Sequence, residues 1–141
     1  FTLRVLTVAD LVKDYTAVMG SLRHLQQHFA YCAAHSVFGP SWPSPDLTLM
    51  EDLADLGWHE VEFRKRSSFT YTVVDPADTE CLGCVYILPP ETCHAEAEVY
   101  LWVTASAFAN GLDDQLFEAV RSWLHSHWPF RVVAFPGRES S

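Results

Sequence analysis

The chain has 141 residues, of which 49% are hydrophobic, and this is enough apolar material to build the core of one domain. Acidic residues outnumber basic ones, 18 to 9, and the net charge of −9 argues against the basic surface that nucleic-acid binding requires. No apolar run reaches the roughly 18 residues of a membrane span, and no secretion signal is visible at the start. We therefore expect a single domain over residues 1–141 in the cytoplasm, with neither membrane nor nucleic acid as a partner.

The N-terminal region predicts a short strand and then a long helix. The strand is expected from Leu3 to Leu6, where β-branched and apolar residues cluster. Thr7 has the side chain of an N-cap, and Asp10 follows it at the positive end of the helix dipole. Apolar residues then recur at helical spacing. We expect one helix over Val8–Phe29, with Gly20 as its weak point.

The middle of the chain predicts a loop and a second helix. Three prolines fall within residues 38–45, and each removes a backbone donor, so this stretch is expected to be irregular. Thr48 and Glu51 form a capping-box pattern that starts the second helix. The basic run Arg64–Arg66 suits the negative end of that helix, where cations offset the dipole.

Three segments with the composition of strands follow at short intervals, over residues 68–74, 81–88 and 98–103. The short turns between them predict an antiparallel meander. Side chains alternate between the two faces of a strand. In the third segment, one face therefore carries Val99, Leu101 and Val103, and the other carries Glu98, Tyr100 and Trp102.

The C-terminal region predicts an amphipathic helix over Leu112–Trp128 and a last strand over Arg131–Phe135. A helix that crosses between two strands of one sheet makes them parallel, so the last strand is expected to run parallel to the third strand of the meander. The whole pattern predicts an α/β fold of the mixed α+β kind, with a mostly antiparallel sheet and helices on both of its faces.

This order, and the hydrophobic placement within residues 81–87, 98–103, 112–128 and 131–135, resemble the GNAT superfamily of N-acyltransferases. The resemblance covers nearly the whole chain, and topology carries it rather than any single motif. It implies a GNAT-like sheet with the order β-α-α-β-β-β-α-β, and transfer of an acyl group from acetyl-CoA to an amine. GNAT domains commonly continue with another helix and two strands after the segment that matches Phe135, and that helix usually carries a thiolate-protonating tyrosine.

In that family the fourth strand leads into a phosphate loop of the form Arg/Gln-x-x-Gly-x-Gly/Ala. The matching stretch here, Phe108–Asp113, keeps Gly111 but has no cation at its first position and an acid at its last. Carboxylates at Asp113 and Asp114 repel an anion, so we expect acyl-CoA to bind weakly, or the helix to carry no phosphate at all. The resemblance implies a cofactor site made of Leu101, Val103, Asn110, Gly111 and Leu112.

The same resemblance implies catalytic residues on the fourth strand. Glu98 is the candidate general base for the amine proton, with Glu96 two residues earlier, and Tyr100 is a candidate acid or substrate wall. Acceptor-site residues are implied on the second helix, namely Trp58, His59 and Glu62. Each also has a plain structural interpretation, as a solvated carboxylate, a packing aromatic or a surface pair.

The cysteines raise the alternative of a metal site. Cys81-x-x-Cys84 and Cys93-His94 contain ligand types that zinc prefers. However, Cys81 and Cys84 lie on a predicted strand, where residues three apart point to opposite faces. We therefore expect no metal, and reduced thiols at these cysteines and at Cys32.

Two functions stay open from the sequence. The first is an acyl-CoA-dependent N-acetyltransferase-like protein that acts on a small-molecule or protein amine. The second is a catalytically inactive GNAT-like domain that serves as a binding or interaction module, which the altered phosphate loop favours. In either case the exposed edge of the last strand offers a surface for a homodimer.

Overall fold

The structure is a computed structural model that describes residues 1–30 and 42–138. Its sheet has five strands in the order β1-β2-β3-β4-β5. The strands are β1 (Thr2–Val5), β2 (Phe69–Val74), β3 (Cys81–Leu88), β4 (Ala97–Val103) and β5 (Val133–Ala134). The helices are the 3₁₀ turn η1 (Val8–Asp10), α1 (Leu11–Gly20), α2 (Leu22–His28), α3 (Leu49–Arg64), α4 (Ala105–Ala109) and α5 (Leu112–His127).

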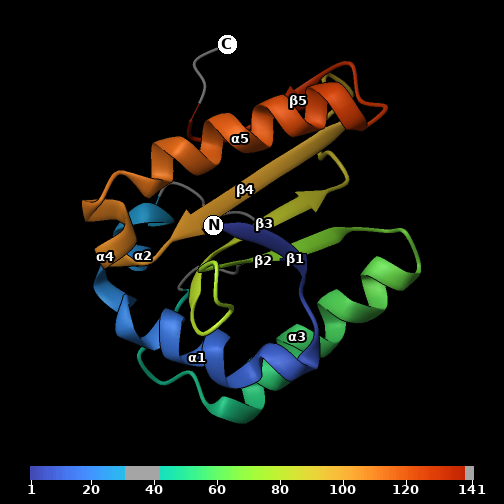
Figure 1. Cartoon of the computed structure of the whole chain (residues 1–141). Helices are drawn as coiled ribbons and strands as arrows, with labels where there is room; N and C mark the ends of the chain where they lie inside the picture. The colour runs from blue at the N-terminus through green and yellow to red at the C-terminus, as the bar shows by residue number, and fades with distance from the viewer. Residues whose placement is uncertain (31–41, 139–141) are drawn as a thin grey trace.

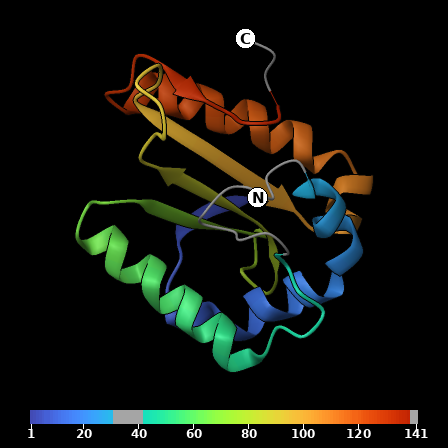
Figure 2. The ribbon, with the colours of Figure 1, turned by 180° about the vertical axis from the view of Figure 1, so that it is seen from behind.

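Helices cover both faces of the sheet, as the sequence predicted (Figure 1). Helix α5 lies along one face, and α1 and α3 lie across the other. The short helices α2 and α4 lie at the end of β4, where its arrow points. The reverse view in Figure 2 has the same three layers. Among the described residues, no helix combines the length and the apolar character needed to cross a membrane.

Strand pairing confirms the predicted mixed sheet. Strands β1 to β4 pair antiparallel, each with the next, and β5 pairs parallel with β4. The parallel pairing is short, because it joins only Ala97 to Val133 and Glu98 to Ala134. Strand β4 then continues to Val103 without β5 beside it.

The single long helix predicted at the N-terminus was wrong. Helix α1 ends at Gly20, the predicted weak point, and α2 starts at Leu22. Between them, the Ser21 N–H bonds the Val18 carbonyl at 3.2 Å, and the Ser21 hydroxyl accepts the Ala105 N–H at 2.9 Å. The break therefore ties the start of α4 to the α1–α2 junction.

Both predicted helix starts are confirmed as capping boxes. The Thr48 side chain accepts from the Glu51 N–H at 3.1 Å, and the Glu51 carboxylate accepts from the Thr48 N–H at 2.9 Å. Thr7 and Asp10 form the same arrangement at η1. Such a cap is worth about 1 kcal/mol because it satisfies helix amides that have no partner within the helix.

The prediction that Cys81 and Cys84 point to opposite faces was wrong. The register between β2 and β3 shifts at Val74, which pairs with Cys81 while Val73 pairs with Gly83. The extra residue, Leu82, packs with the α5 side, and both thiols lie on the α1 and α3 side. A β-bulge of this kind breaks the strict alternation on which the prediction depended.

Two hydrophobic clusters lie on the two faces of the sheet. We call the side under α5 the α5 face, and its buried sheet and helix side chains include Val73, Val85, Ile87, Val99, Leu101, Val103, Leu116, Val120 and Leu124. We call the side under α1 and α3 the α1/α3 face, and its buried cluster includes Leu56, Cys81, Cys84, Tyr86, Tyr100 and Trp102. The sheet face of Glu98 is therefore the α1/α3 face, because Glu98 alternates with Val99 and shares a side with Tyr100.

Candidate functional site

The edge of β4 beyond its pairing with β5 is the part of the fold where the cofactor site was expected. The Leu101 carbonyl, on this edge, is held by two side chains. His28 Nε2 lies 2.9 Å from the Leu101 oxygen, and Arg138 Nη2 donates to the same oxygen at 3.1 Å. Since a carbonyl oxygen only accepts, the geometry assigns a proton to His28 Nε2. A carbonyl has two lone pairs, and both are used here.

The stretch Phe108–Asp113, which the resemblance matches to a phosphate loop, contains the end of α4 and the start of α5. Phe108 lies inside α4, and Gly111 is a left-handed residue, with φ of 81°, between α4 and α5. The Gly111 N–H donates to the Phe108 carbonyl at 3.0 Å, and the Asn110 N–H donates to α4 carbonyls. These amides end a helix, so they are not free to bind a phosphate.

Asp113, in the first turn of α5, forms an ion pair with Arg138. Arg138 Nη1 donates to Asp113 Oδ2 at 2.7 Å, and Nη2 donates to Oδ1 at 2.8 Å. Each side chain is only 12% exposed. Burial raises the pKa of the Asp113 carboxyl, but the hydrogen bonds and the charge of Arg138 outweigh that effect and hold the pKa below its usual value.

Aromatic rings surround this ion pair. The Phe117 ring lies 5.5 Å from the Arg138 guanidinium, which is a cation–π distance. The His28 ring lies 6.2 Å from His24, whose ring is 4.9 Å from Phe108. Burial, together with the nearby Arg138 charge, lowers the pKa of His28, so this ring is neutral at pH 7.

The five residues expected at the cofactor site do not form one open surface. The side chains of Leu101 and Val103 are buried in the α5 face, at 1% and 0% exposed. Asn110 and Leu112 do line a common pocket, of about 320 Å³. Glu80 lines the same pocket, and its carboxylate does not favour an anion there.

The two carboxylates considered for catalysis differ in their surroundings. Glu98 is 7% exposed, and its Oε1 accepts the Glu91 N–H at 3.3 Å. Glu96 accepts the backbone N–H groups of Arg131 and Val132, so it holds the turn before β5. Tyr100 is 5% exposed in the α1/α3 face.

The three residues expected at an acceptor site, all on α3, have different surroundings. His59 is bonded to the sheet, with Nδ1 3.0 Å from the Thr70 hydroxyl, and its ring contacts Tyr86 at 5.4 Å. Burial lowers the pKa of His59 to about 4. Trp58 is exposed on α3, and Glu62 accepts the Ser67 N–H with its carbonyl at 3.0 Å. The His59 ring thus packs between Tyr86 and Trp58, whose ring lies 5.1 Å away, and Glu62 lies near the end of the helix.

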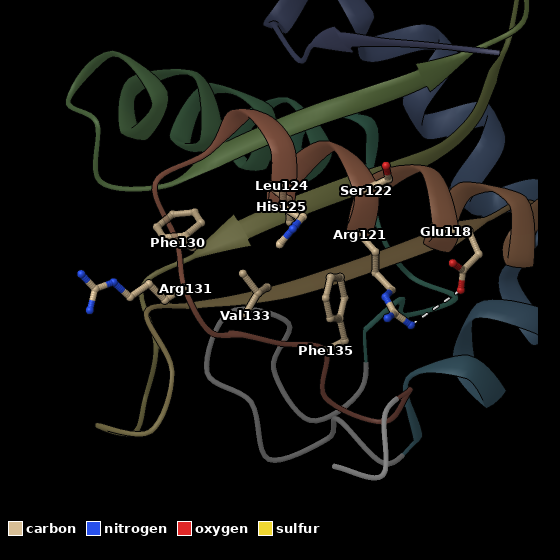
Figure 3. Close-up of a pocket in the computed structure, with 9 residues that line it drawn as sticks. All are labelled: Glu118, Arg121, Ser122, Leu124, His125, Phe130, Arg131, Val133 and Phe135. Carbon is tan, nitrogen blue, oxygen red and sulfur yellow. Dashed lines mark ion pairs between the residues drawn. The ribbon is translucent and has the colours of Figure 1, made fainter.

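A separate pocket of about 410 Å³ lies between α5 and β5 (Figure 3). Its lining is drawn in the figure and consists of Glu118, Arg121, Ser122, Leu124, His125, Phe130, Arg131, Val133 and Phe135. Arg121 and Glu118 form an ion pair at 3.7 Å along one wall. None of the residues expected at the catalytic, cofactor or acceptor sites lines this pocket.

Arg138 and a buried pair of acids were not among the site residues expected from the sequence. Arg138 follows a turn at Gly137, where its N–H bonds the Phe135 carbonyl at 3.0 Å. Asp14 and Asp52 are 5% and 3% exposed, and the two carboxyls lie close enough to influence each other's pKa. Burial, then the neighbouring Asp52 charge, raises the pKa of Asp14 well above its usual value. The signal that was present is the helical spacing that turns Asp14 inward beside Val18.

The cysteines of the α1/α3 face are also buried beside these acids. Thr72 Oγ1 donates to the Cys81 sulfur at 3.6 Å, and the Cys81 thiol donates to the Gly83 carbonyl at 3.2 Å. Burial raises the pKa of Cys81 to about 12, so this thiol is protonated. Within residues 1–30 and 42–138, no three His, Cys, Asp or Glu side chains are arranged to hold a metal ion. Cys32 lies outside the described residues.

Comparisons with known proteins give a structural match only. No protein-family model and no curated protein matches the sequence. Among solved structures, the ribosomal-protein-S5-alanine acetyltransferase from Vibrio fischeri matches with a TM-score of 0.64 and 15% identity over 86% of this chain. The ribosomal L7/L12 α-N-protein acetyltransferase in complex with coenzyme A matches with a TM-score of 0.65 and 16% identity over 86% of this chain.

A third match is the spermidine N-acetyltransferase from Vibrio cholerae in complex with CoA and spermine, with a TM-score of 0.56 and 16% identity over 86% of this chain. The chain spans 62% of the length of each of these three proteins. At such identities the matches establish the arrangement of strands and helices, and the chemistry has to be argued from the site.

Proposed function

We propose that this chain, which has the fold of the GNAT acetyltransferases, acts as an acetyl-CoA-dependent N-acetyltransferase on a small-molecule or protein amine. The observation that carries the proposal is the parallel pairing of β4 with β5, which stops after Ala134 and leaves the rest of β4 facing the start of α5. The charge of the chain supports the amine, because a net charge of −9 attracts a protonated amine.

In the arrangement described, the β4 edge does not fit acetyl-CoA. The Leu101 carbonyl already has two donors, the Asn110 and Gly111 amides end α4, and Asp113 holds the neighbouring cation. One feature does suit an anion, since no side chain caps the first turn of α5. For this reason we derive no chemical step that passes through the cofactor.

Glu98 is the proposed acceptor of the amine proton. Its carboxylate is on the strand that borders the proposed cofactor edge, and one of its oxygens is fixed by the Glu91 amide. Fixing a base in one orientation favours proton transfer, because little reorganisation is then needed. Tyr100, on the same sheet face, is the proposed wall of the acceptor site. The further proposed residues are His59, which packs on Tyr86, with exposed Trp58 and half-buried Glu62.

The experiment is acetyl transfer from acetyl-CoA to two amines, spermidine and a peptide with an N-terminal alanine. We expect Glu98→Gln to lower kcat/KM by about 10²-fold, the usual contribution of a general base. Glu96→Gln is the matched control, because it keeps an oxygen for the Arg131 and Val132 amides, and it is expected to lower the rate less. An unchanged rate in Glu98→Gln would remove this residue from the base role.

The second candidate function is a binding module without catalysis. Phe108 inside α4 and the Asp113–Arg138 ion pair favour it, because both remove features that bind phosphates. Calorimetry separates the two functions. No heat of binding with acetyl-CoA at millimolar concentration, together with no turnover, would support the binding module and reject the enzyme.

The homodimer is proposed on the outer edge of β5. Val132, immediately before this strand, is 52% exposed, and the edge of β5 that faces away from β4 has no strand partner among residues 1–30 and 42–138. Edges of this kind pair readily with a second chain. Sedimentation equilibrium tests the proposal, and a monomer at concentrations of about 100 µM, well above ordinary dimer affinities, would reject it.

A further inference from the structure

We propose that Arg138 and Asp113 form an autoinhibitory latch on the β4 edge, and that this latch has to open before an acyl-CoA can bind beside Leu101. The inference rests on the proposed function, since it names a regulation of that same site. The latch consists of the Arg138 guanidinium, the Asp113 carboxylate and the Leu101 carbonyl.

The first argument is the position of the guanidinium. Arg138 joins the first turn of α5 to the open edge of β4, because it donates both to Asp113 and to the Leu101 carbonyl, at 2.7, 2.8 and 3.1 Å. An extended ligand that adds to the edge of a strand needs the backbone acceptors of that edge. Arg138 takes one lone pair of Leu101, and His28 takes the other.

The second argument is the strength of the pair. Two parallel hydrogen bonds join a guanidinium to a carboxylate, which is the strongest geometry that such a pair adopts. The side chains are each only 12% exposed, so water and salt screen their charges weakly. The Phe117 ring covers the guanidinium from another side at 5.5 Å. A closed latch is therefore the stable state in the absence of a ligand.

The third argument is that the Asp113–Arg138 ion pair leaves no net positive charge at the β4 edge. The Arg138 guanidinium lies beside the first turn of α5, and Asp113 neutralises its charge. Asp114 adds a further negative charge in the same turn. Opening the latch therefore removes a steric and hydrogen-bonding block and also releases a cation.

The test uses S-acetyl-pantetheine, which has the amides and the thioester of acetyl-CoA but no phosphates, so changes of protein charge act on it only weakly. The double variant Asp113→Asn/Arg138→Gln keeps the shape of residue 113, shortens residue 138 and removes the ion pair. Calorimetry is expected to give at least 10-fold tighter binding of S-acetyl-pantetheine to the double variant than to the wild type.

Arg121→Gln is the matched control. Arg121 also lies over the Phe117 ring at 5.5 Å, but its ion pair is with Glu118, along the wall of the pocket between α5 and β5. We expect its affinity for the probe to equal that of the wild type. Thermal unfolding of all three proteins checks that each is folded, and the NMR signal of the Arg138 Nε–H in the wild type is expected to move when the probe is added.

The outcomes separate this proposal from the proposed function. If the wild type binds acetyl-CoA and the double variant binds the probe no tighter than the wild type, the latch is rejected and the function stands. If no form binds acetyl-CoA or the probe at millimolar concentration, the proposed function fails, and the latch fails with it. Tighter binding by Arg121→Gln as well would also reject the latch, because the effect would then not be specific to Arg138.

Discussion

The two faces of the sheet differ in kind. Under α5, the buried side chains of the core are almost entirely aliphatic. Under α1 and α3, the core includes two thiols, two tyrosines and a tryptophan, and its helices bury carboxylates and a histidine. There, Trp102 donates its indole N–H to the Tyr86 hydroxyl at 2.9 Å, and His59 is bonded to Thr70.

Because of this difference, pH and ligands should affect the α1/α3 face more than the α5 face. The fully buried side chains of the α5 face are apolar, so the stability that comes from burying them depends little on pH. A polar face is stabilised only while its buried groups keep their partners and their protonation states. The catalytic candidates Glu98 and Tyr100 lie on the α1/α3 face. The latch closes the β4 edge, which lies between the two faces.

Truncating a buried leucine should change the stability most, and by different amounts on the two faces of the sheet. Leu116→Ala, on α5, removes a fully buried side chain and leaves a dry cavity, so we expect the free energy of unfolding to fall by about 4 kcal/mol. Leu56→Ala, on α3, is expected to cost at least about 1 kcal/mol less, because a cavity near Asp52 is polar enough to admit water. Urea unfolding at pH 7 measures both. Equal losses would contradict the contrast between the faces.

The second effect is the loss of stability in acid. The pKa of His59 is about 4 in the folded protein and about 6.5 when unfolded, so the unfolded chain binds a proton first as the pH falls. The lowered pKa means that stability is complete above pH 6.5 and falls between pH 6.5 and 4. At pH 5 the loss is about 2 kcal/mol.

The control for this prediction is His59→Gln, which removes the titrating group. His28, whose pKa is also lowered, and Asp113, whose pKa is below its usual value, act in the same direction and are present in both proteins. The difference between wild type and variant therefore isolates His59. Unfolding curves at pH 5 and pH 7.5 that change by the same amount in both proteins would show that His59 is not the cause.

The smallest expected effect is a gain. The raised pKa of Asp14 means that the folded state holds a proton that the unfolded state releases above pH 3.8, so this group costs stability at neutral pH. Asp14→Asn keeps a donor toward Asp52 and carries no charge. We expect stability at pH 8 to rise by about 1 kcal/mol, the scale of one satisfied hydrogen bond, with little change at pH 4. A loss of stability at pH 8 would show that the charge is needed there.

Local patterns predicted the elements well. The capping boxes at Thr7 and Thr48, the three-strand meander and the parallel last strand all follow from spacing within a few residues or from the handedness of crossovers. Gly20 was recognised as a weak point, but a full break there was not expected, and the bond from Ala105 to Ser21 that accompanies it comes from far along the chain. Helix α4 was missed because a family motif was expected in the same place.

The candidate site was less predictable than the fold. Alternation assigned Glu98 and Tyr100 to the correct face. The side chains of Leu101 and Val103 are buried, so only their backbone groups are available to a ligand, and their place in a cofactor site stays a prediction. Arg138 could not be found from its neighbours in the sequence. The stem of an arginine side chain is long and flexible, so the sequence does not say which carboxylate its planar guanidinium will pair with, and the packing of α5 places Asp113 there.

The extra residue in β3 has a consequence for comparing this sequence with others. Residues before Leu82 are out of phase with those after Gly83, so Cys81 and Cys84 share a face although they are three positions apart. An alignment that treats β3 as one unbroken strand would assign the residues on one side of Leu82 to the wrong face of the sheet. A gap placed at Leu82 aligns β3 correctly with a strand that has no bulge. Deleting the codon for Leu82 would give β3 the regular alternation of such a strand.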